Sequence, residues 1–311
     1  MDDWTHVRSK KSRKKKPRAK ERKQDNNMSQ SSTVFTTQLT ELESSPENVG
    51  SLVEYVTLEL KRIKFMPFFA ALCKSFSTAL SSAPTHMVMY GIGPFSNAIN
   101  DDASLTHKYT PGTQLAVALL LMEHFSCNTA IYHDPVMTEL EVTTLKTLNS
   151  NIQILENNNR GVYCIDDLLQ HKPDDCIMYM PHCPLALYSN VIWSNWSKLL
   201  LKRLFIFGNS FESYHFEADI SPNASNACFY PLLPFMTELD VVLGVEFESA
   251  FWSSKIIYIH PDQQQEFEKK LVDAVGVGVG EDEGAGSSLL VRPSLPEPHL
   301  DTDELLSDTK F

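Results

Sequence analysis

Thr85-His-Met-Val-Met-Tyr-Gly-Ile-Gly-Pro-Phe-Ser-Asn97 is the stretch of sequence that decides the fold. Its apolar run, residues 87–90, has no polar alternation, which is typical of a parallel strand covered by helices on both faces. Glycine at positions 91 and 93 allows a positive φ and a close approach of the backbone to a ligand, as in the first turn of a nucleotide-binding α/β sheet. The stretch therefore predicts a buried strand that leads into a ligand-binding turn.

This turn lacks two features of the dinucleotide-binding fingerprint. Ser96 stands where the third glycine would be. No acidic residue follows at a second strand end about 20 residues further on, where one would contact the ribose. The first acidic residue at a strand end is Asp134. The pattern argues against a nicotinamide cofactor and leaves other ligands open.

The same kind of apolar run recurs along the chain. Five such runs end in glycine or a small polar group, at residues 87–90, 130–132, 152–155, 177–180 and 204–207. Helix-like segments separate them, so the sequence predicts an α/β fold, a Rossmann-like three-layer sandwich with a mostly parallel sheet.

In such a sheet the ligand crevice lies beyond the carboxyl ends of the strands. We therefore expect one ligand-binding site, built from residues that follow the five runs. These residues are Gly91, Gly93, Ser96, Asp134, Asn157, His182, Cys183 and Asn209. Polar residues end strands in every sheet because loops are hydrated, so a purely structural role stays open as the alternative.

Helices and further segments are expected around these strands. The expected helices cover residues 48–80 (one or two helices), 114–125 and 137–148. Residues 100–112 should form a long loop, of the kind that often moves as a lid beside a glycine turn. Glu139 and Glu141 fall in the first turns of a helix, where the dipole favours anions, and no other role is expected for them. The last apolar run, residues 255–260, predicts an edge strand.

Charge is segregated along the 311 residues. Residues 1–25 contain eleven Lys and Arg against four acidic residues, a net charge of +7. The whole chain carries a net charge of −12, so the remaining residues carry −19. The sequence predicts a basic and then Ser/Thr-rich disordered tail over residues 1–48, one α/β domain over 49–263 and an acidic disordered tail over 264–311. The basic run at 10–23 is either a nuclear localisation signal, a phosphate-binding arm or a solvated tail. Any contact with nucleic acid falls to this arm, because the domain itself is acidic.

Cysteine usage and hydropathy bear on the cellular setting. The six cysteines form no CxxC pair, which predicts reduced thiols in an intracellular protein. The chain shows neither a secretory signal pattern at its start nor an apolar run of about 18 residues, so no membrane association is expected.

Pro181-His-Cys-Pro184 is an unusual strand end. A histidine beside a cysteine can lower the pKa of the thiol and create a nucleophile. The pair could also bind a soft metal or, through Cys183, a haem iron. The alternative is a packed thiol beside a hydrogen-bonded histidine, since free cysteine is often buried.

Several motifs in one order resemble a known family, the one named for the plant gene "sensitivity to red light reduced". The motifs are Tyr90-Gly-Ile-Gly-Pro-Phe-Ser96, Gln114-Leu-Ala116, Tyr132-His-Asp-Pro135, Tyr179-Met-Pro-His-Cys-Pro184, Leu187-Tyr-Ser-Asn190, Trp193-Ser-Asn-Trp196 and Gly208-Asn-Ser-Phe211. The resemblance covers about residues 50–260. By this resemblance Asn190 and Asn195 join the core positions of the family.

The resemblance implies a regulator in the cytoplasm and nucleus. It implies roles in circadian clock input, clock-gene expression and, in animals, haem biosynthesis, with protein partners that are not identified. No catalytic assignment is carried over, and the sequence shows no evident set of acid, base and nucleophile. We therefore expect a non-enzymatic regulator that binds a small ligand or a partner.

Two other hypotheses stay open. In the first, the chain is a methyltransferase-like enzyme that binds adenosyl-methionine, with the Gly-x-Gly turn at the methionine part and Asp134 on the ribose hydroxyls. Pro181-His-Cys-Pro184 stands where an acceptor motif would be expected after the fourth strand. In the second, Cys183 or His182 binds haem, and the protein is a haem sensor.

Overall fold

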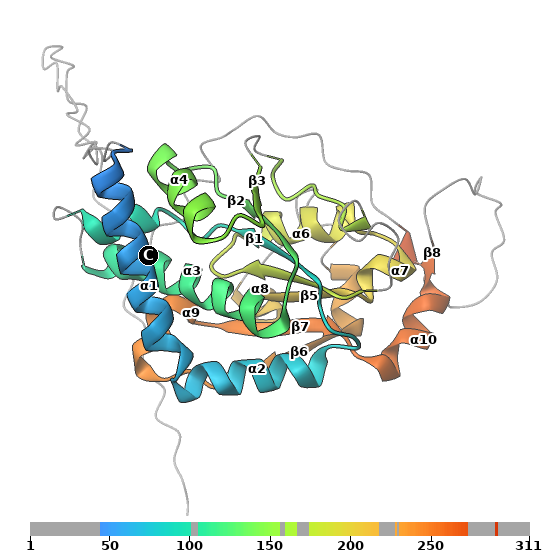
Figure 1. Ribbon diagram of the computed structural model, residues 1–311. Coiled ribbons are helices and arrows are strands. Elements are labelled where there is room, and N and C mark those ends of the chain that lie inside the picture. Colours follow the sequence, from blue (N-terminus) through green and yellow to red (C-terminus); the bar gives the residue numbers. More distant parts are fainter. Residues whose placement is uncertain are drawn as a thin grey trace, which may run out of the picture. The chain divides into compact units, whose positions relative to one another are not determined.

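A seven-stranded sheet is the centre of the protein, as seen in a computed structural model that describes residues 44–100, 105–155, 159–166, 174–217, 228, 230–272 and 290–291. The strand order is β3-β2-β1-β4-β5-β7-β6 (Figure 1). The strands are β1 His86–Tyr90, β2 Thr129–His133, β3 Ile152–Ile154, β4 Cys176–Met180, β5 Leu204–Asn209, β6 Met236–Asp240 and β7 Ser254–Ile259. The first five are parallel, which confirms the predicted α/β class and mostly parallel sheet. A separate two-stranded sheet pairs β8 Leu271–Val272 with β9 Leu290–Val291.

The prediction of an edge strand at residues 255–260 is wrong. Strand β7 pairs antiparallel with β5 on one side and with β6 on the other. Its last four residues, Ile256 to Ile259, are all buried, as expected of a strand inside a sheet. The edge strand is β6, in which no residue is buried and which carries Glu238 and Asp240. Charged side chains on an exposed edge oppose pairing with other chains.

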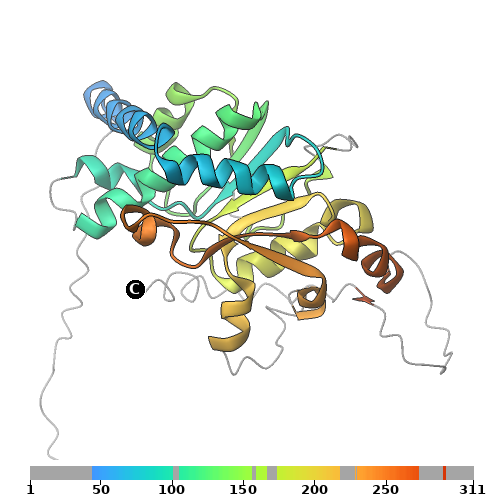
Figure 2. The ribbon, with the colours of Figure 1, turned by 90° about the horizontal axis from the view of Figure 1, so that it is seen from below.

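Helices cover both faces of the sheet (Figure 2). They are α1 Pro46–Lys64, α2 Pro67–Ala79, α3 Leu105–Phe125, α4 Glu139–Leu148, α6 Leu185–Ser194, α7 Lys198–Leu201, α8 Phe211–Glu217, α9 Glu248–Phe251 and α10 Pro261–Lys270. Short 3-10 helices in the described residues are η1 Phe95–Ile99, η3 Tyr230–Phe235 and η4 Val245–Phe247. Local signals set the first boundary, because the Ser45 side chain caps α1 at the Asn48 N–H and a proline follows at its first position.

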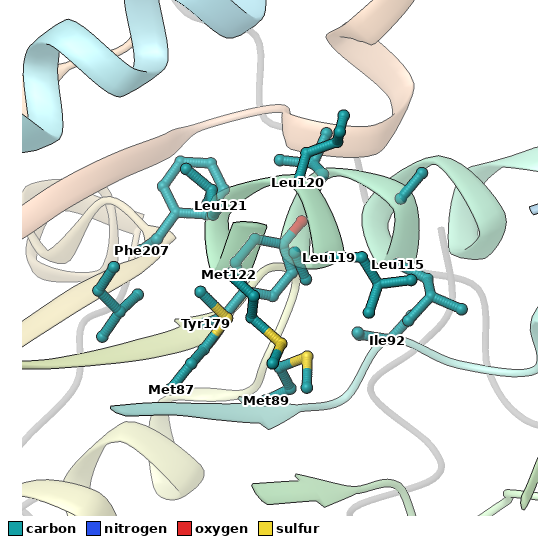
Figure 3. Close-up of a cluster of buried hydrophobic side chains, with 14 of the residues drawn as sticks. Met87, Met89, Ile92, Leu115, Leu119, Leu120, Leu121, Met122, Tyr179 and Phe207 are labelled. Atoms are coloured by element: carbon teal, nitrogen blue, oxygen red, sulfur yellow. The ribbon is translucent and has the colours of Figure 1, made fainter. Parts of the chain in front are cut away.

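Alternation along the strands builds two hydrophobic layers. Met87 and Met89 of β1 point toward α3, where they meet Leu119 and Met122 (Figure 3). Val88 belongs to the opposite layer, together with residues of α6 and α10. Helices α1 to α4 and α9 therefore cover one face, and α6, α7 and α10 cover the other. The apolar runs of the sequence are explained by this double coverage.

The predicted long loop over residues 100–112 is wrong from Leu105 onward, where α3 begins. The Thr-Pro-Gly triplet at 110–112 signalled a loop because proline and glycine usually interrupt helices. In the structure both residues lie inside α3, and Gly112 has a neighbour that leaves no room for a side chain. A Cβ atom on Gly112 would lie 2.4 Å from the Tyr55 hydroxyl, so the glycine lets α1 pack closely against α3.

The packed region extends past the expected boundary at Gln263. Helix α10 runs to Lys270, with Phe267 fully buried. At the other end it begins with α1, while the basic run at 10–23 lies outside the described residues. The six cysteines all lie in the described ranges, and none of them is in a disulfide there. None of the helices in the described ranges is both long and apolar enough to cross a bilayer.

We predict that Gly112→Ala lowers the free energy of unfolding by about 1–3 kcal/mol, the usual cost of overpacking. The added methyl group would meet the Tyr55 ring, with atoms at 2.4–2.8 Å. In a Tyr55→Leu background the same substitution should cost clearly less, because the clashing atoms are gone. Urea denaturation of the four proteins measures the coupling.

Gly50→Ala serves as the control for this experiment. A Cβ atom on Gly50, in α1, meets nothing within 4 Å. Alanine there should stabilise the protein by up to about 1 kcal/mol through helix propensity. An equal penalty for Gly112→Ala with and without Tyr55 would show that the close packing of α1 on α3 is not the cause.

Candidate functional site

The sheet has a topological switch point between β1 and β4. Strands β2 and β3 lie on one side of β1, and β4 and β5 lie on the other. The loops that follow β1 and β4 therefore lead away in opposite directions, and in open α/β sheets ligands bind in the crevice between such loops. The loop at 91–94 and the loop at 181–184 border this position.

Gly91 and Gly93 give the loop after β1 its course. Their φ angles are +63° and +84°, in the left-handed region that disfavours other residues. A Cβ atom on Gly91 would lie 2.7 Å from the Sγ atom of Cys183. Glycine at 91 is thus required both by its φ angle and by the close approach of the loop after β4.

Asp134, at the carboxyl end of β2, holds this loop in place. Its Oδ2 atom accepts a hydrogen bond from the Gly93 N–H at 2.7 Å, and its Oδ1 atom accepts one from the Val136 N–H at 3.0 Å. The side chain is buried, and burial raises its pKa while the two N–H groups act in the opposite direction. Asp134 therefore joins the loops after β1 and β2, with each oxygen engaged by a backbone donor.

Glu141, in the first turn of α4, also holds a neighbouring segment in place through its carboxylate. The sequence analysis missed this role. Its Oε1 atom accepts from the Ser96 N–H at 2.8 Å and its Oε2 atom from the Thr138 N–H at 2.9 Å. The side chain is fully buried, and burial raises its pKa. Thr138, followed by Glu141 three residues later, forms a capping box, and this spacing was the available signal. Ser96 is buried and hydrogen-bonds to Glu141 through both its backbone N–H and its side chain, so it lies in a buried contact and not at an open site.

The side chains of His182 and Cys183 form hydrogen bonds with different residues. His182 has a φ of +56°, and its Nε2–H donates to the Ala250 carbonyl at 3.0 Å. The Cys183 thiol lies 3.5 Å from the Tyr90 carbonyl, to which it donates. Burial lowers the pKa of His182 and raises the pKa of Cys183. These contacts favour the packed-thiol alternative over an activated cysteine.

Asn209 joins the ends of β4 and β5. Its Oδ1 atom accepts from the His182 N–H at 3.0 Å, and its Nδ2 group donates to the Tyr214 hydroxyl at 2.8 Å. Tyr214 in turn donates to the Cys183 carbonyl at 2.7 Å. The hydroxyl of Tyr188 accepts from the Asn209 N–H at 2.9 Å. The two tyrosines were not predicted, because only the fold brings α6 and α8 to this edge.

Other predicted positions lie elsewhere. Asn157 is outside the described residues. Asn195 is fully buried and binds the Ile165 N–H at 2.8 Å through its Oδ1 atom. Asn190 donates to the Arg160 carbonyl at 2.8 Å. Both asparagines fasten the segment before β4 to α6. In the described ranges no group of three or more His, Cys, Asp or Glu side chains is placed to hold a metal ion.

The fold and this edge define a Rossmann-like α/β protein with a candidate ligand site at its switch point. The sequence profile of the SRR1 domain matches residues 59–273, and the chain belongs to this family. An SRR1-like protein of Mus musculus is 36% identical over 138 residues, which are 42% of this chain and 47% of that protein. The family resemblance stated from the motifs is thereby confirmed.

Two further relatives extend the comparison. Protein SENSITIVITY TO RED LIGHT REDUCED 1 of Arabidopsis thaliana is 27% identical over 201 residues, 60% of this chain and 65% of that protein. An SRR1-like protein of Drosophila melanogaster is 29% identical over 126 residues, 40% of this chain and 39% of that protein. The matched regions thus span between 39% and 65% of these relatives. No solved structure matches the chain.

We predict that Glu141 gives the protein a pH-dependent stability. Burial raises its folded-state pKa above the ordinary value of 4.5. The folded protein then binds more protons than the unfolded chain in the window above pH 4.5, so the free energy of unfolding falls as the pH rises through it. Glu141→Gln removes this contribution, and its stability should fall less steeply with pH when both proteins are unfolded with urea.

Glu139→Gln is the matched control on the same helix, because the Glu139 side chain is exposed. Its pH profile should follow that of the wild type. Parallel profiles for wild type and Glu141→Gln would contradict a raised pKa of the buried Glu141 carboxyl.

A second prediction concerns thiol reactivity. Cys183 is 2% exposed, whereas Cys164 is partly exposed. Only the thiolate reacts, and burial disfavours it at Cys183. Iodoacetamide should therefore alkylate Cys164 first and Cys183 at least about tenfold more slowly, as followed by peptide mass spectrometry. Preferential labelling of Cys183 in the folded protein would instead restore the activated-cysteine hypothesis.

Proposed function

We propose that the chain is a regulatory protein of the SRR1 family that binds a small molecule at the carboxyl edge of its sheet and performs no catalysis there. The name of the Arabidopsis relative ties that protein to red-light sensitivity. For this chain we propose a role in circadian clock input and clock-gene expression, and in the regulation of haem biosynthesis. A cytoplasmic and nuclear location, with residues 10–23 as the nuclear signal, belongs to the same proposal.

One observation carries the non-catalytic part of the proposal. The polar side chains at the switch point bind backbone groups of neighbouring loops: Asp134 binds Gly93, Asn209 binds His182, and His182 binds Ala250. A catalytic set needs a nucleophile within hydrogen-bond reach of its base. Here the Cys183 thiol donates to a carbonyl instead. The edge is built to hold its loops in one arrangement, and a ligand that binds there would stabilise that arrangement.

Adenosyl-methionine is a second candidate ligand, with the Gly-x-Gly turn after β1 and Asp134 at the end of β2 as the positions that would hold it. Antiparallel β7 lies between β5 and β6 in the sheet. Strand order defines a fold and not a reaction. Both oxygens of Asp134, the carboxylate expected to hold the ribose, already accept backbone hydrogen bonds. Haem binding through Cys183 has less support, because the thiol is buried against Gly91.

Thermal unfolding of the full chain tests the proposal. The ligands are nucleotides, adenosyl-methionine, adenosyl-homocysteine and haem. A ligand at a hundredfold excess over its dissociation constant should stabilise the fold by about 2.7 kcal/mol. Gly93→Asn should abolish the stabilisation, because asparagine tolerates a positive φ but adds a side chain to the turn.

Gly50→Ala, far from the turn in the sequence and open around its Cβ, should respond as the wild type does. Stabilisation that survives Gly93→Asn would place the ligand elsewhere. If no compound stabilises the wild type, the proposed ligand site is wrong and the protein acts through its surface. If the protein turns over a substrate and Asp134→Ala abolishes that turnover, the non-catalytic assignment is wrong.

A further inference from the structure

A cavity of about 370 Å³ lies at the start of the edge strand β6. Its lining residues are Glu212, Leu233, Met236 and Glu238. Two carboxylates and two apolar side chains therefore share one cavity. None of the lysine and arginine side chains in the described ranges forms an ion pair with either carboxylate. This composition suits a lysine or arginine side chain, which has an aliphatic stem and a cationic head.

The carboxylate of Glu238 is held in a fixed position in this cavity. Its Oε1 atom accepts a hydrogen bond from the Glu212 N–H at 2.8 Å, and its Oε2 atom accepts one from the Ser210 hydroxyl at 2.7 Å. Both donors are neutral, so they orient the carboxylate and leave its negative charge uncompensated. The exposed side chain of Glu212 adds a second negative charge. The cavity is therefore arranged for a cation before any cation binds.

The cavity adjoins the free side of the sheet. Strand β6 pairs with β7, and none of the other strands in the described part of the chain pairs with its outer side (Figure 1). Met236 and Glu238 are two residues apart on β6, so their side chains point to the same face. A segment added along β6 would place one of its own side chains opposite Glu238, with the two Cβ atoms about 4.5–5.5 Å apart. An extended peptide therefore fits this edge and its cavity together.

Charge selects the occupant of this edge. Pairing of β6 with β6 of a second copy would bring the carboxylates of both copies to one seam, which is unfavourable. The chain after residue 25 carries a net charge of −19, which attracts basic segments from a distance. Val242 and Val245, shortly after the strand, are 73% and 82% exposed, so a segment that extends past β6 also meets apolar surface.

We infer that β6 and the adjoining cavity bind an extended basic segment of a partner protein by strand addition, with a lysine or arginine of that segment between Glu212 and Glu238. Main-chain hydrogen bonds along β6 supply the affinity, and the cavity supplies specificity for the cationic side chain. The acidic edge thus disfavours acidic chains and accepts basic ones. The inference goes beyond the proposed small-molecule site and does not depend on it.

Selection from a randomised decapeptide library displayed on mRNA, with the full chain as bait, tests the inference. We expect the enriched peptides to share a lysine or arginine within a run of β-branched or aromatic residues. Their affinity, measured by fluorescence polarisation, should fall at least about tenfold in Glu212→Lys, because like charges then repel in the cavity. A selection that enriches no sequence, or sequences without lysine and arginine, would overturn the inference.

Glu139→Lys is the matched control for this variant. It makes the same change of charge at an exposed position of α4, a helix that packs against β3 at the opposite edge of the sheet. Its affinity for the peptides should equal that of the wild type. An equal loss in Glu139→Lys and Glu212→Lys, or no loss in either, would show that the peptides bind elsewhere and would contradict the assignment of the cavity.

N-methylated forms of the enriched peptides test strand addition on the unchanged protein. In an added strand, alternate N–H groups point toward the neighbouring strand and the others point away from it. Methylation of one alternate set of amides should therefore weaken binding at least about tenfold, whereas methylation of the other set should leave most of the affinity. Equal effects of the two sets would show that the peptide does not pair with β6 as a strand, and the inference would then be wrong even if Glu212→Lys did not fold.

Discussion

Two buried carboxylates that accept backbone N–H groups hold together the loops at the carboxyl edge of the sheet. Asp134 binds the turn after β1 and the start of the next loop, and Glu141 binds the first residues of η1 and its own helix cap. Charged groups are costly to bury unless hydrogen bonds compensate them. Each carboxylate here accepts hydrogen bonds from two backbone N–H groups. Together they fix the loop after β1, which Gly91 and Gly93 would otherwise make flexible. The course of the chain across the switch point depends on these contacts.

The same contacts restrict what the edge can do. Groups that elsewhere serve as acids, bases or nucleophiles are here bound to carbonyl and N–H groups, as in His182 with Ala250 and Cys183 with Tyr90. In the function proposed above, a ligand at this edge would act through the positions of the loops, because a change in loop position alters the surface offered to a partner.

Much of the fold was predictable from the sequence, and the limits have physical causes. The five parallel strands were evident because double coverage by helices leaves uninterrupted apolar runs, and the glycine turn was evident from Gly91 and Gly93. The position of β7 inside the sheet was not predictable, since a strand in the middle of a sheet and a strand at its edge can have the same apolar sequence pattern. The first part of helix α3 was not predicted because Pro111 and Gly112 are typical of loops, and the reason for Gly112, its contact with Tyr55 of α1, is not visible in the local sequence. At the site, the sequence located Asp134 and Asn209 but not their partners, because hydrogen bonds between loops are decided by tertiary structure.

The insertion of β7 between β5 and β6 has a consequence for the synthesis of the chain. Strand β5 leaves the ribosome long before β7, so its edge has no partner until residues 254–259 have been made. An unpaired edge of buried-type residues is a template for wrong pairing with other chains. The nascent domain therefore carries an aggregation-prone edge from the synthesis of β5 until that of β7, and the last strand of this sheet to emerge is the one that covers it.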